Sequence, residues 1–356
     1  MPAAPMRLAV VAAGLDILGG QGVQARALVD ELRREGCRVD FLPINPRFPG
    51  RLAWLRGVPC ARTALNQSLY LPSLWRLRDA DVVHVFSASY WSFLLGPAPA
   101  ILVARALGKR VVLNYHSGEA DDHLARWGAL VHPFLRQADE IVVPSEYLRK
   151  VFAHHGHRAR VIRNVVDPSH FRYRERRRLA PRLLSSRNLE PHYRVENTLR
   201  AFGLVRARHP GATLTIAGYG SQEARLRRVA EDIGGGTRFV GRVEPAAMPR
   251  LYDEADIFLN SSVVDNQPVS ILEAFAAGLP VVSTATGDLA AMVRHRETGL
   301  VVNAEDPAGM ADAVATLLDD PASALALAGR ARAEAESYTW PRVRDLWAEA
   351  YGGLAA

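Results

Sequence analysis

The sequence predicts an α/β protein made of two doubly wound parallel sheets. Its 356 residues exceed the size of one small domain, and a hydrophobic content of 49% is enough for two cores. Short runs rich in β-branched residues alternate with amphipathic helical patterns, which is typical of consecutive βαβ units. The alternation stops at residues 167–181, a polar, arginine-rich segment, and then starts again. Each half therefore predicts one sheet with its own helices.

In the first half, helices such as residues 23–35 and 146–154 lie between apolar runs and show apolar residues at helical spacing. Residues 82–104 carry no charge, but prolines and serines interrupt them, so they predict a strand, a loop and a buried helix rather than a membrane span. Strands are expected at residues 8–13, 38–43, 82–87, 110–115, 140–144 and 160–166.

The second half repeats this order and predicts the domain division. We expect a first domain over residues 1–167, a second over 168–340, and a last helix, 341–356, that crosses back to the first domain. Ligands of doubly wound sheets bind at the carboxyl ends of the strands, so two such facing sheets predict an interdomain cleft. Strands are expected at residues 182–186, 213–217, 238–240, 257–260, 280–283 and 299–302, and helices at 195–207, 222–233 and 270–277.

The composition excludes several classes of protein. Two cysteines, Cys37 and Cys60, are too few for a disulfide scaffold or a four-ligand zinc site. The formal net charge is +7, but the arginines are scattered along the whole chain, which does not predict a nucleic-acid footprint. The first apolar run is short and lacks a cleavage site, so no signal peptide is predicted. We expect a cytoplasmic protein.

One dense basic run holds six of the arginines, at positions 172, 174, 176, 177, 178 and 182. We interpret it as a solvated linker. The alternative is a patch that contacts anionic lipid headgroups, which would place the protein peripherally at the inner face of a membrane.

A glycine cluster, Gly14–Gly22, lies between the first strand and the first helix. Gly20-x-Gly22-x-x-Ala25 formally matches the dinucleotide-binding fingerprint, and Asp40 follows at a plausible distance. In the true fingerprint, however, the first glycine follows the strand at once, whereas Gly20 comes seven residues after the expected strand end. We expect a loop whose backbone amides approach a ligand at a helix N-terminus.

The segment 260–280 combines a strand, a polar loop and a helix with two acidic residues. Pro268 suits the first helical turn, so the amides around Val269 and Ser270 would face an anion placed before the helix. Asp265 and Glu273 could then border one pocket, and Glu273 lies among apolar residues, where a lone glutamate is costly. The alternative is structural, with Asp265 as a cap and Glu273 paired to an arginine.

The run PVSILEAFAAGLPVVST at residues 268–284, with Asp265 and Glu273 separated by seven residues, resembles the acid-x7-Glu region of retaining glycosyltransferases of family four. These are GT-B enzymes, with two facing Rossmann-like domains. Further stretches agree in order and spacing: Gly19–Val23, Asn114–His116, Val161–Asp167, Arg187, Ile216–Gly220, Phe239–Val243 and Ala255–Ser261.

The resemblance implies retaining transfer of a hexosyl unit from a UDP- or GDP-sugar to an unidentified hydroxyl acceptor, in glycan, glycolipid or glycoside biosynthesis. It implies no cofactor and no metal, because an arginine and a helix dipole take the place of the cation. The residues that it implies as catalytic are His116, Arg187, Asp265 and Glu273. On the donor side it adds Gly22, Arg194, Gly218, Val243, Asn266, Gln267, Pro268, Val269 and Ser270, and on the acceptor side Gly20, Gln21, Tyr90 and Trp91.

Each implied role is local. Glu273 would accept hydrogen bonds from the ribose, and Arg187 would neutralise the departing diphosphate. Asp265 and the amides of residues 266–270 would hold the sugar and its β-phosphate. Val243 would meet the base through its backbone, and His116 would approach the sugar from the other domain.

The sequence departs from the family pattern where a lysine usually follows the arginine. Pro191, His192, Tyr193 and Arg194 stand in that loop instead. Arg194 is always charged and precedes a helix, whereas His192 is largely neutral at pH 7, so we predict Arg194 as the second cation and His192 as its hydrogen-bonding neighbour. Asp265 also replaces the usual glutamate, and Arg163 and Val165 replace the usual hinge proline and glycine.

An aromatic stretch, Tyr90, Trp91, Phe93, Leu94 and Leu95, predicts an apolar lip near the acceptor, with burial under the first sheet as the alternative. Four other functions compete with transfer: a hydrolase or phosphorylase of the same fold, a nucleotide-sugar epimerase, a non-catalytic subunit of a glycan-assembly complex, and an NAD-dependent dehydrogenase. The joint presence of His116, Arg187, Asp265 and Glu273 favours a catalytic glycosyltransferase.

Overall fold

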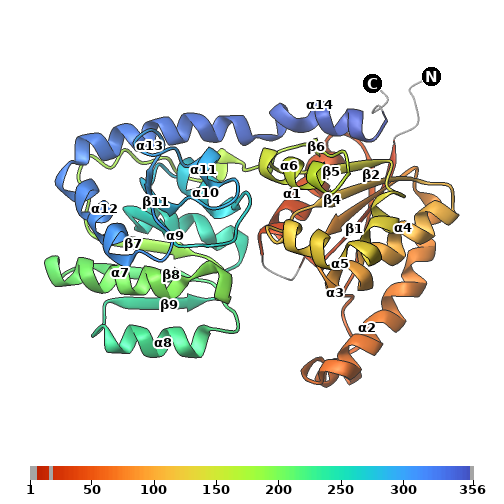
Figure 1. Ribbon diagram of the computed structural model, residues 1–356, viewed down its shortest axis with the longest axis horizontal. Coiled ribbons are helices and arrows are strands. Elements are labelled where there is room, and N and C mark those ends of the chain that lie inside the picture. The colour runs from red at the N-terminus through yellow and green to blue at the C-terminus, as the bar shows by residue number, and fades with distance from the viewer. Residues whose placement is uncertain (1–5, 16–18, 353–356) are drawn as a thin grey trace. The chain divides into compact units, whose positions relative to one another are not determined.

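The computed structural model describes residues 6–15 and 19–352, apart from the side chains of residues 53, 56 and 59. The chain forms two compact units, and each contains a six-stranded parallel sheet flanked by helices (Figure 1). Unit 1 comprises Met1–Arg163 and Val343–Ala356, and unit 2 comprises Asn164–Arg342. The predicted class, α/β with two doubly wound parallel sheets, is confirmed.

The sheet of unit 1 has the strand order β2-β1-β3-β4-β5-β6. Every residue of the central strand β3 is buried, as expected where helices cover both faces of a parallel sheet. The strands are β1 (Arg7–Ala12), β2 (Arg38–Pro43), β3 (Val82–Ser87), β4 (Arg110–Tyr115), β5 (Glu140–Val143) and β6 (Arg160–Val161). The α-helices are α1 (Gly20–Arg34), α2 (Pro59–Ser73), α3 (Trp91–Leu95), α4 (Pro97–Ala106), α5 (Ala120–Leu135) and α6 (Glu146–His154).

The helix α14 (Trp340–Ala350) contributes its residues from Val343 onward to unit 1. Tyr351, just after α14, places its hydroxyl 2.9 Å from Nδ1 of the buried His84 on β3, and the ring of Trp347 lies 5.0 Å from the His84 ring. Arg160 on β6 donates to Glu349 at 2.7 Å. The C-terminal segment is therefore part of the packing of this unit.

The predicted glycine loop is wrong for Gly20, Gln21 and Gly22. These residues form the first turn of α1, which begins three residues earlier than expected, and Gly19 precedes it in an extended conformation with φ −176°. A helix start leaves its first amides without intrahelical partners, so glycines there need no loop to expose their N–H groups. Residues 16–18 of the predicted loop lie outside the described residues.

Unit 2 has the strand order β12-β11-β10-β7-β8-β9. Its helix α10 is almost entirely apolar and has seven of its residues buried. The strands are β7 (Arg182–Ser186), β8 (Thr213–Ala217), β9 (Thr237–Gly241), β10 (Ile257–Asn260), β11 (Val281–Thr284) and β12 (Leu300–Val302). The α-helices are α7 (Val195–Arg208), α8 (Glu223–Asp232), α9 (Met248–Glu254), α10 (Val269–Ala276), α11 (Leu289–Met292), α12 (Pro307–Asp319) and α13 (Pro321–Ala335).

Strand β6 is much shorter than the predicted strand 160–166. Ile162 still donates to the carbonyl of Val143 on β5 at 3.0 Å. Further along, the backbone N–H of Asn164 donates to Gln267 Oε1 at 2.6 Å, and that of Val166 donates to the carbonyl of Tyr338 at 2.8 Å. Residues past 163 therefore leave the first sheet because their donors are satisfied elsewhere.

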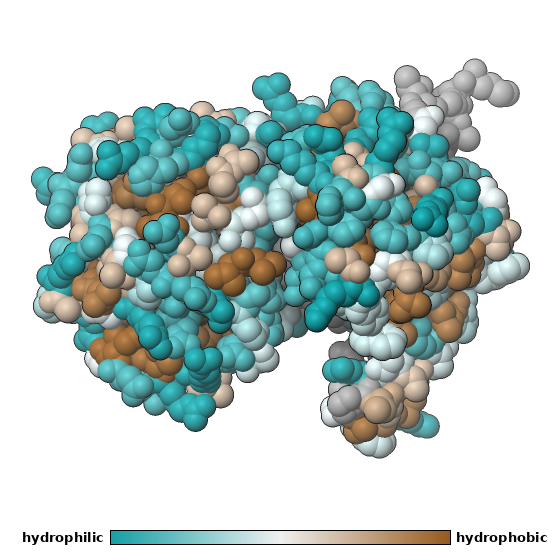
Figure 2. All heavy atoms as spheres, viewed as in Figure 1, coloured by the Kyte–Doolittle hydropathy of each residue, from teal (hydrophilic) through white to brown (hydrophobic). Residues whose placement is uncertain are grey.

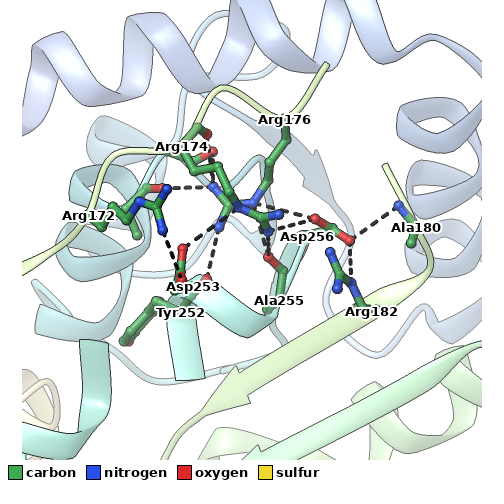
Figure 3. Close-up of polar contacts among 11 residues, drawn as sticks. Arg172, Arg174, Arg176, Ala180, Arg182, Tyr252, Asp253, Ala255 and Asp256 are labelled. Carbon is green, nitrogen blue, oxygen red and sulfur yellow. Dashed lines mark hydrogen bonds and ion pairs between the residues drawn. The ribbon is translucent and has the colours of Figure 1, made fainter. Parts of the chain in front are cut away.

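The interpretation of the arginine run as a solvated linker holds for Arg172, Arg177 and Arg178, which are exposed, but is wrong for Arg176. Arg176 is only 3% exposed and donates to the carbonyl oxygens of Tyr252 and Ala255 at 2.9 and 3.0 Å (Figure 3). It also donates to those of Ala277 and Gly278 at 2.7 and 2.9 Å. Helices leave their last carbonyl groups without intrahelical partners, and α9 and α10 end here, so buried donors are needed. Burial lowers the pKa of Arg176 to about 10, which leaves it charged at neutral pH.

The neighbouring arginines of this run neutralise one buried acid. Asp256, which is fully buried, pairs with Arg174 at 2.9 Å and with Arg182 at 2.7 Å (Figure 3). Arg174 and Arg182 are thus paired within unit 2, whereas the lipid-facing alternative stays a prediction for the exposed arginines of the run. Within the described residues, no helix combines the length and the apolar character needed to cross a membrane.

We predict that Arg176→Ala lowers the free energy of unfolding by about 3–5 kcal/mol, because several buried carbonyl groups and Asp256 lose a charged donor. The matched control is Arg177→Ala, since the Arg177 side chain is 80% exposed and pairs with Glu175. Its effect should stay within about 0.5 kcal/mol. Guanidinium denaturation measures both, and equal midpoints for the two variants would contradict the structural role of Arg176.

Candidate active site

Arg187 follows β7 at the carboxyl edge of the second sheet. Its guanidinium forms an ion pair with Asp265 and donates to Ser270 Oγ at 3.2 Å. The side chains of Arg187 and Asp265 are only 9% and 10% exposed, so water screens the pair weakly. The guanidinium also lies over the ring of Tyr193, with 4.2 Å from Cζ to the ring centroid. The structure thus brings three predicted residues together and adds Tyr193.

One donor of this guanidinium is unused. The Nε atom of Arg187 is buried and has no hydrogen-bond partner among the described residues. Buried donors are nearly always paired in folded proteins, and a guanidinium can hold an anion by two parallel N–H bonds. The site therefore has capacity for an additional acceptor next to Arg187.

Two glycines are required by close backbone contacts beside this pair. A Cβ atom on Gly218, whose φ is +148°, would lie 1.9 Å from the carbonyl oxygen of Arg187. A Cβ atom on Gly287 would lie 2.0 Å from the carbonyl oxygen of Asp265. Gly218 was predicted to bind the donor. The structure requires glycine there independently of any ligand, because a side chain would clash with the Arg187 backbone where β8 ends.

The helix α10 presents its N-terminus beside Ser270. It begins at Val269, and Pro268 immediately precedes it with φ −69° and ψ 122°, rather than lying in its first turn as predicted. Asn266, Gln267, Val269 and Ser270 are all buried. The unpaired amides and the dipole of a helix N-terminus stabilise an anion, so Arg187 and α10 supply positive potential at the same place.

Glu273 lies one turn into α10 and is paired to a tyrosine, so the alternative of an arginine partner is wrong. The Tyr252 hydroxyl on α9 lies 2.7 Å from Glu273 Oε2 and 3.1 Å from the Ser270 carbonyl oxygen. Burial raises the pKa of Glu273 to about 7, while the Tyr252 hydrogen bond acts in the opposite direction. Glu273 therefore changes charge near neutral pH. Asp265 accepts from the Asn266 N–H at 3.0 Å besides its ion pair.

The other residues of unit 2 that were predicted to bind the donor lie in several of its segments. Gln267 uses its side-chain oxygen and its carbonyl group to bind Asn164, at 2.6 and 2.8 Å. Val243 follows β9 and is partly buried. Arg194 has a left-handed backbone with φ +47° and pairs with Glu305 at 2.9 Å, with both side chains well exposed. The ring of His192 packs on Tyr193, with 4.1 Å between their centroids.

In unit 1, two predicted residues meet at one carbonyl group. The carbonyl oxygen of Ser87, at the end of β3, accepts from the backbone N–H of His116 at 3.2 Å and from Gln21 Nε2 at 2.9 Å. The His116 ring stacks on Phe86 with 5.3 Å between centroids. Its Nε2 is buried without a partner among the described residues, and burial lowers its pKa to about 4. His116 is therefore a neutral imidazole at pH 7.

The predicted apolar lip is wrong for Phe93, which is fully buried in the core of unit 1. The short helix α3 turns Phe93 inward and leaves Trp91 65% exposed, with its ring edge-on to Trp127 at 5.1 Å. Tyr90 precedes α3 with φ +56° and donates to Asp122 at 2.5 Å. Tyr90 and Trp91 are thus part of an aromatic cluster with Trp127, which the sequence did not indicate.

Tyr193 and Tyr252 are the contacts of Arg187 and Glu273 that sequence reasoning missed. In the sequence, Tyr252 resembles any aromatic residue of a buried helix, and no motif indicates that its hydroxyl contacts a site residue. Tyr193 had a weak signal, because it lies in the loop where a second phosphate-binding group was sought.

The raised pKa of Glu273 predicts a pH-dependent stability. Between the ordinary glutamate pKa and about 7, the folded protein binds more protons than the unfolded chain, so the free energy of unfolding falls as pH rises from 5 to 8. Glu273→Gln should remove on the order of 2 kcal/mol of this fall. Tyr252→Phe should enlarge it, because the carboxylate loses a donor.

Urea denaturation at pH 5 and pH 8 measures the effect, with Glu231→Gln at an exposed position as the matched control. Parallel pH profiles for wild type and Glu273→Gln would show that Glu273 is not the titrating group.

The chain matches family profiles over most of its length. Residues 180–320 match the profile described as Glycosyl transferases group 1, and residues 18–170 match Glycosyltransferase Family 4. The glycogen synthase of Mycobacterium tuberculosis is 34% identical over 299 residues, which cover 78% of this chain and 69% of that protein. The GDP-mannose-dependent alpha-(1-6)-phosphatidylinositol monomannoside mannosyltransferase of the same species is 31% identical over 336 residues, which cover 86% and 81%.

Solved structures share the fold at lower identity. Anabaena HepE, solved with UDP and glucose, has a TM-score of 0.75 and 17% identity, and the match covers 99% of this chain and 100% of that one. The sucrose-phosphate synthase of Thermosynechococcus elongatus has a TM-score of 0.75 and 20% identity, with 98% of each chain covered.

Proposed function

The chain belongs to the group 1, family 4 glycosyltransferases of the GT-B fold, and we propose that it moves a hexosyl unit from UDP- or GDP-sugar to a hydroxyl acceptor. Membership of this family confirms the resemblance noted in the sequence and sets the dehydrogenase alternative aside. The observation that carries the proposal is the Arg187 guanidinium, packed on Tyr193 beside Ser270 at the start of α10. The product is a glycan, a glycolipid or a glycoside.

The proposed step breaks the bond between the anomeric carbon and the oxygen of the β-phosphate. Negative charge grows on the departing diphosphate, and Arg187 with the N-terminus of α10 stabilises it without a metal ion. The acceptor oxygen forms the new bond on the same face of the sugar, and its proton passes to the leaving phosphate. The free Nε donor of Arg187 supports this assignment, because a phosphate oxygen is an acceptor that suits it.

We assign the two acidic residues to different parts of the donor. Glu273, held by Tyr252, accepts hydrogen bonds from the ribose hydroxyls. Asp265 exchanges part of its contact with Arg187 for a sugar hydroxyl when the diphosphate takes the guanidinium. The family resemblance assigns a contact with a sugar hydroxyl to His116, which is a neutral imidazole with a free Nε2.

We predict retention at the anomeric carbon. The protein, incubated with UDP-glucose or GDP-mannose and a panel of glycosyl acceptors, should give a product whose linkage has the α configuration of the donor, and activity should survive EDTA. A proton NMR time course distinguishes the two anomers as they form. A β-linked first product would overturn the retaining assignment, and loss of activity in EDTA would overturn metal independence.

The second phosphate-binding cation can be tested by separating Arg194 from its ion pair. We expect Arg187→Ala to weaken UDP or GDP about tenfold to a hundredfold and the monophosphates little, because only the diphosphate reaches the guanidinium. Arg194→Ala should weaken the diphosphates selectively, though less, since it is more exposed. Glu305→Ala, which frees Arg194, should keep or improve affinity. Calorimetry measures the affinity of each variant for UDP and GDP. If Arg194→Ala bound both as tightly as wild type, Arg194 would not be a phosphate-binding residue, and its only role would be the surface ion pair with Glu305.

A further inference from the structure

An arm projects from unit 1 between β2 and β3. It consists of the short 3-10 helix η1 (Gly50–Gly57) and α2, and Figure 1 shows α2 running from the sheet to a tip beyond it. The sheet end of α2 is anchored, because Tyr70 is fully buried and donates to the carbonyl of Gly96 at 2.7 Å. Between residues 60 and 69, by contrast, no side chain is buried. We call residues 50–65 the tip.

The tip exposes apolar side chains. Trp54 is 69% exposed and Val58 is 44% exposed, and Figure 2 shows apolar side chains at this end of the unit. Single exposed apolar residues are common, but several on one projecting segment are typical of a surface that contacts a partner. A helix of this length is also marginal on its own, so tertiary or interfacial contacts must contribute to its stability. The tip therefore has the properties of an unoccupied contact surface.

The charge of this arm identifies the partner. Residues 50–73 contain three arginines, Arg51, Arg56 and Arg62, and no acidic residue. Arg51 and Arg62, at the tip, are exposed and form no ion pair within the described part of the chain. A basic surface with an exposed tryptophan is typical of proteins that lie in the headgroup region of an anionic bilayer. An uncharged glycan has no negative groups to pair with these arginines, whereas the phosphates of an anionic bilayer do.

We propose that the tip binds the surface of an anionic lipid bilayer. Trp54 and Val58 enter the headgroup region, where an indole ring has both apolar and polar surroundings, and Arg51 and Arg62 contact lipid phosphates. This surface is separate from the buried arginine cluster around Asp256, whose guanidinium groups are already bound within unit 2. The proposal does not depend on the sugar donor or on the reaction.

Co-sedimentation with vesicles tests the proposal. The wild-type chain should bind vesicles with 30% phosphatidylglycerol in phosphatidylcholine, bind pure phosphatidylcholine at least tenfold more weakly, and be released by high salt. Arg51→Gln with Arg62→Gln should weaken binding about thirtyfold, since each arginine near an anionic surface contributes about fivefold. Trp54→Ser should weaken it further by removing the inserted ring.

Matched controls are Arg228→Gln on α8 and Leu130→Ser on α5, which change exposed residues of the same types elsewhere. Circular dichroism and UDP affinity should be unchanged in every variant, which separates loss of lipid binding from misfolding. The proposal is overturned if the double arginine variant binds like wild type, if neutral and anionic vesicles bind equally, or if the tip captures a soluble glycan and no vesicles.

Discussion

Unit 2 depends on the buried guanidinium of Arg176, which binds the carbonyl groups left over where α9 and α10 end. Tyr252 connects this interaction to the candidate site: its carbonyl oxygen accepts from Arg176, and its hydroxyl lies 2.7 Å from Glu273. α9 and α10 are thereby linked twice: by Arg176, which binds carbonyl groups at their C-terminal ends, and by the hydrogen bond between Tyr252 and Glu273. The positions of Ser270 and Glu273 on α10 follow from a contact made by a residue that does not line the site.

The candidate site itself is organised by electrostatics in a weakly screened setting. The ion pair with Asp265 and the contact with the Tyr193 ring hold the Arg187 guanidinium in one orientation. The cation is therefore oriented before a ligand binds. The backbone allows this geometry only because glycine occupies positions 218 and 287. A preorganised cation with one unused donor is well suited to receive charge that develops during a reaction.

Much of the fold was predictable from local patterns. Strands β3, β4, β7, β8 and β10 have the predicted bounds, because buried parallel strands read as continuous apolar runs. The helix that holds Glu273 begins and ends within one residue of the predicted bounds, and Asp265 lies in the loop before it, as predicted. What could not be predicted depends on residues distant in sequence. Arg176 looks solvated until the carbonyl groups of α9 and α10 are known, and β6 ends early because Asn164 bonds to Gln267. The pairing of Glu273 with Tyr252 joins two residues that lie 21 positions apart in the sequence, on different helices.

The return of α14 to the first sheet affects the order in which the chain can fold. Unit 2 is continuous in sequence, whereas unit 1 is completed by residues after 342. Until Trp347 and Tyr351 emerge from the ribosome, His84 lacks the aromatic cover and the hydroxyl partner that it has in the native protein. Synthesis proceeds from the N-terminus, and domains generally fold as units. Unit 1 is therefore the first to be synthesised in part and the last to receive all of its residues. Throughout the synthesis of unit 2, the nascent chain therefore has all six strands of the first sheet but lacks the C-terminal segment that packs on them.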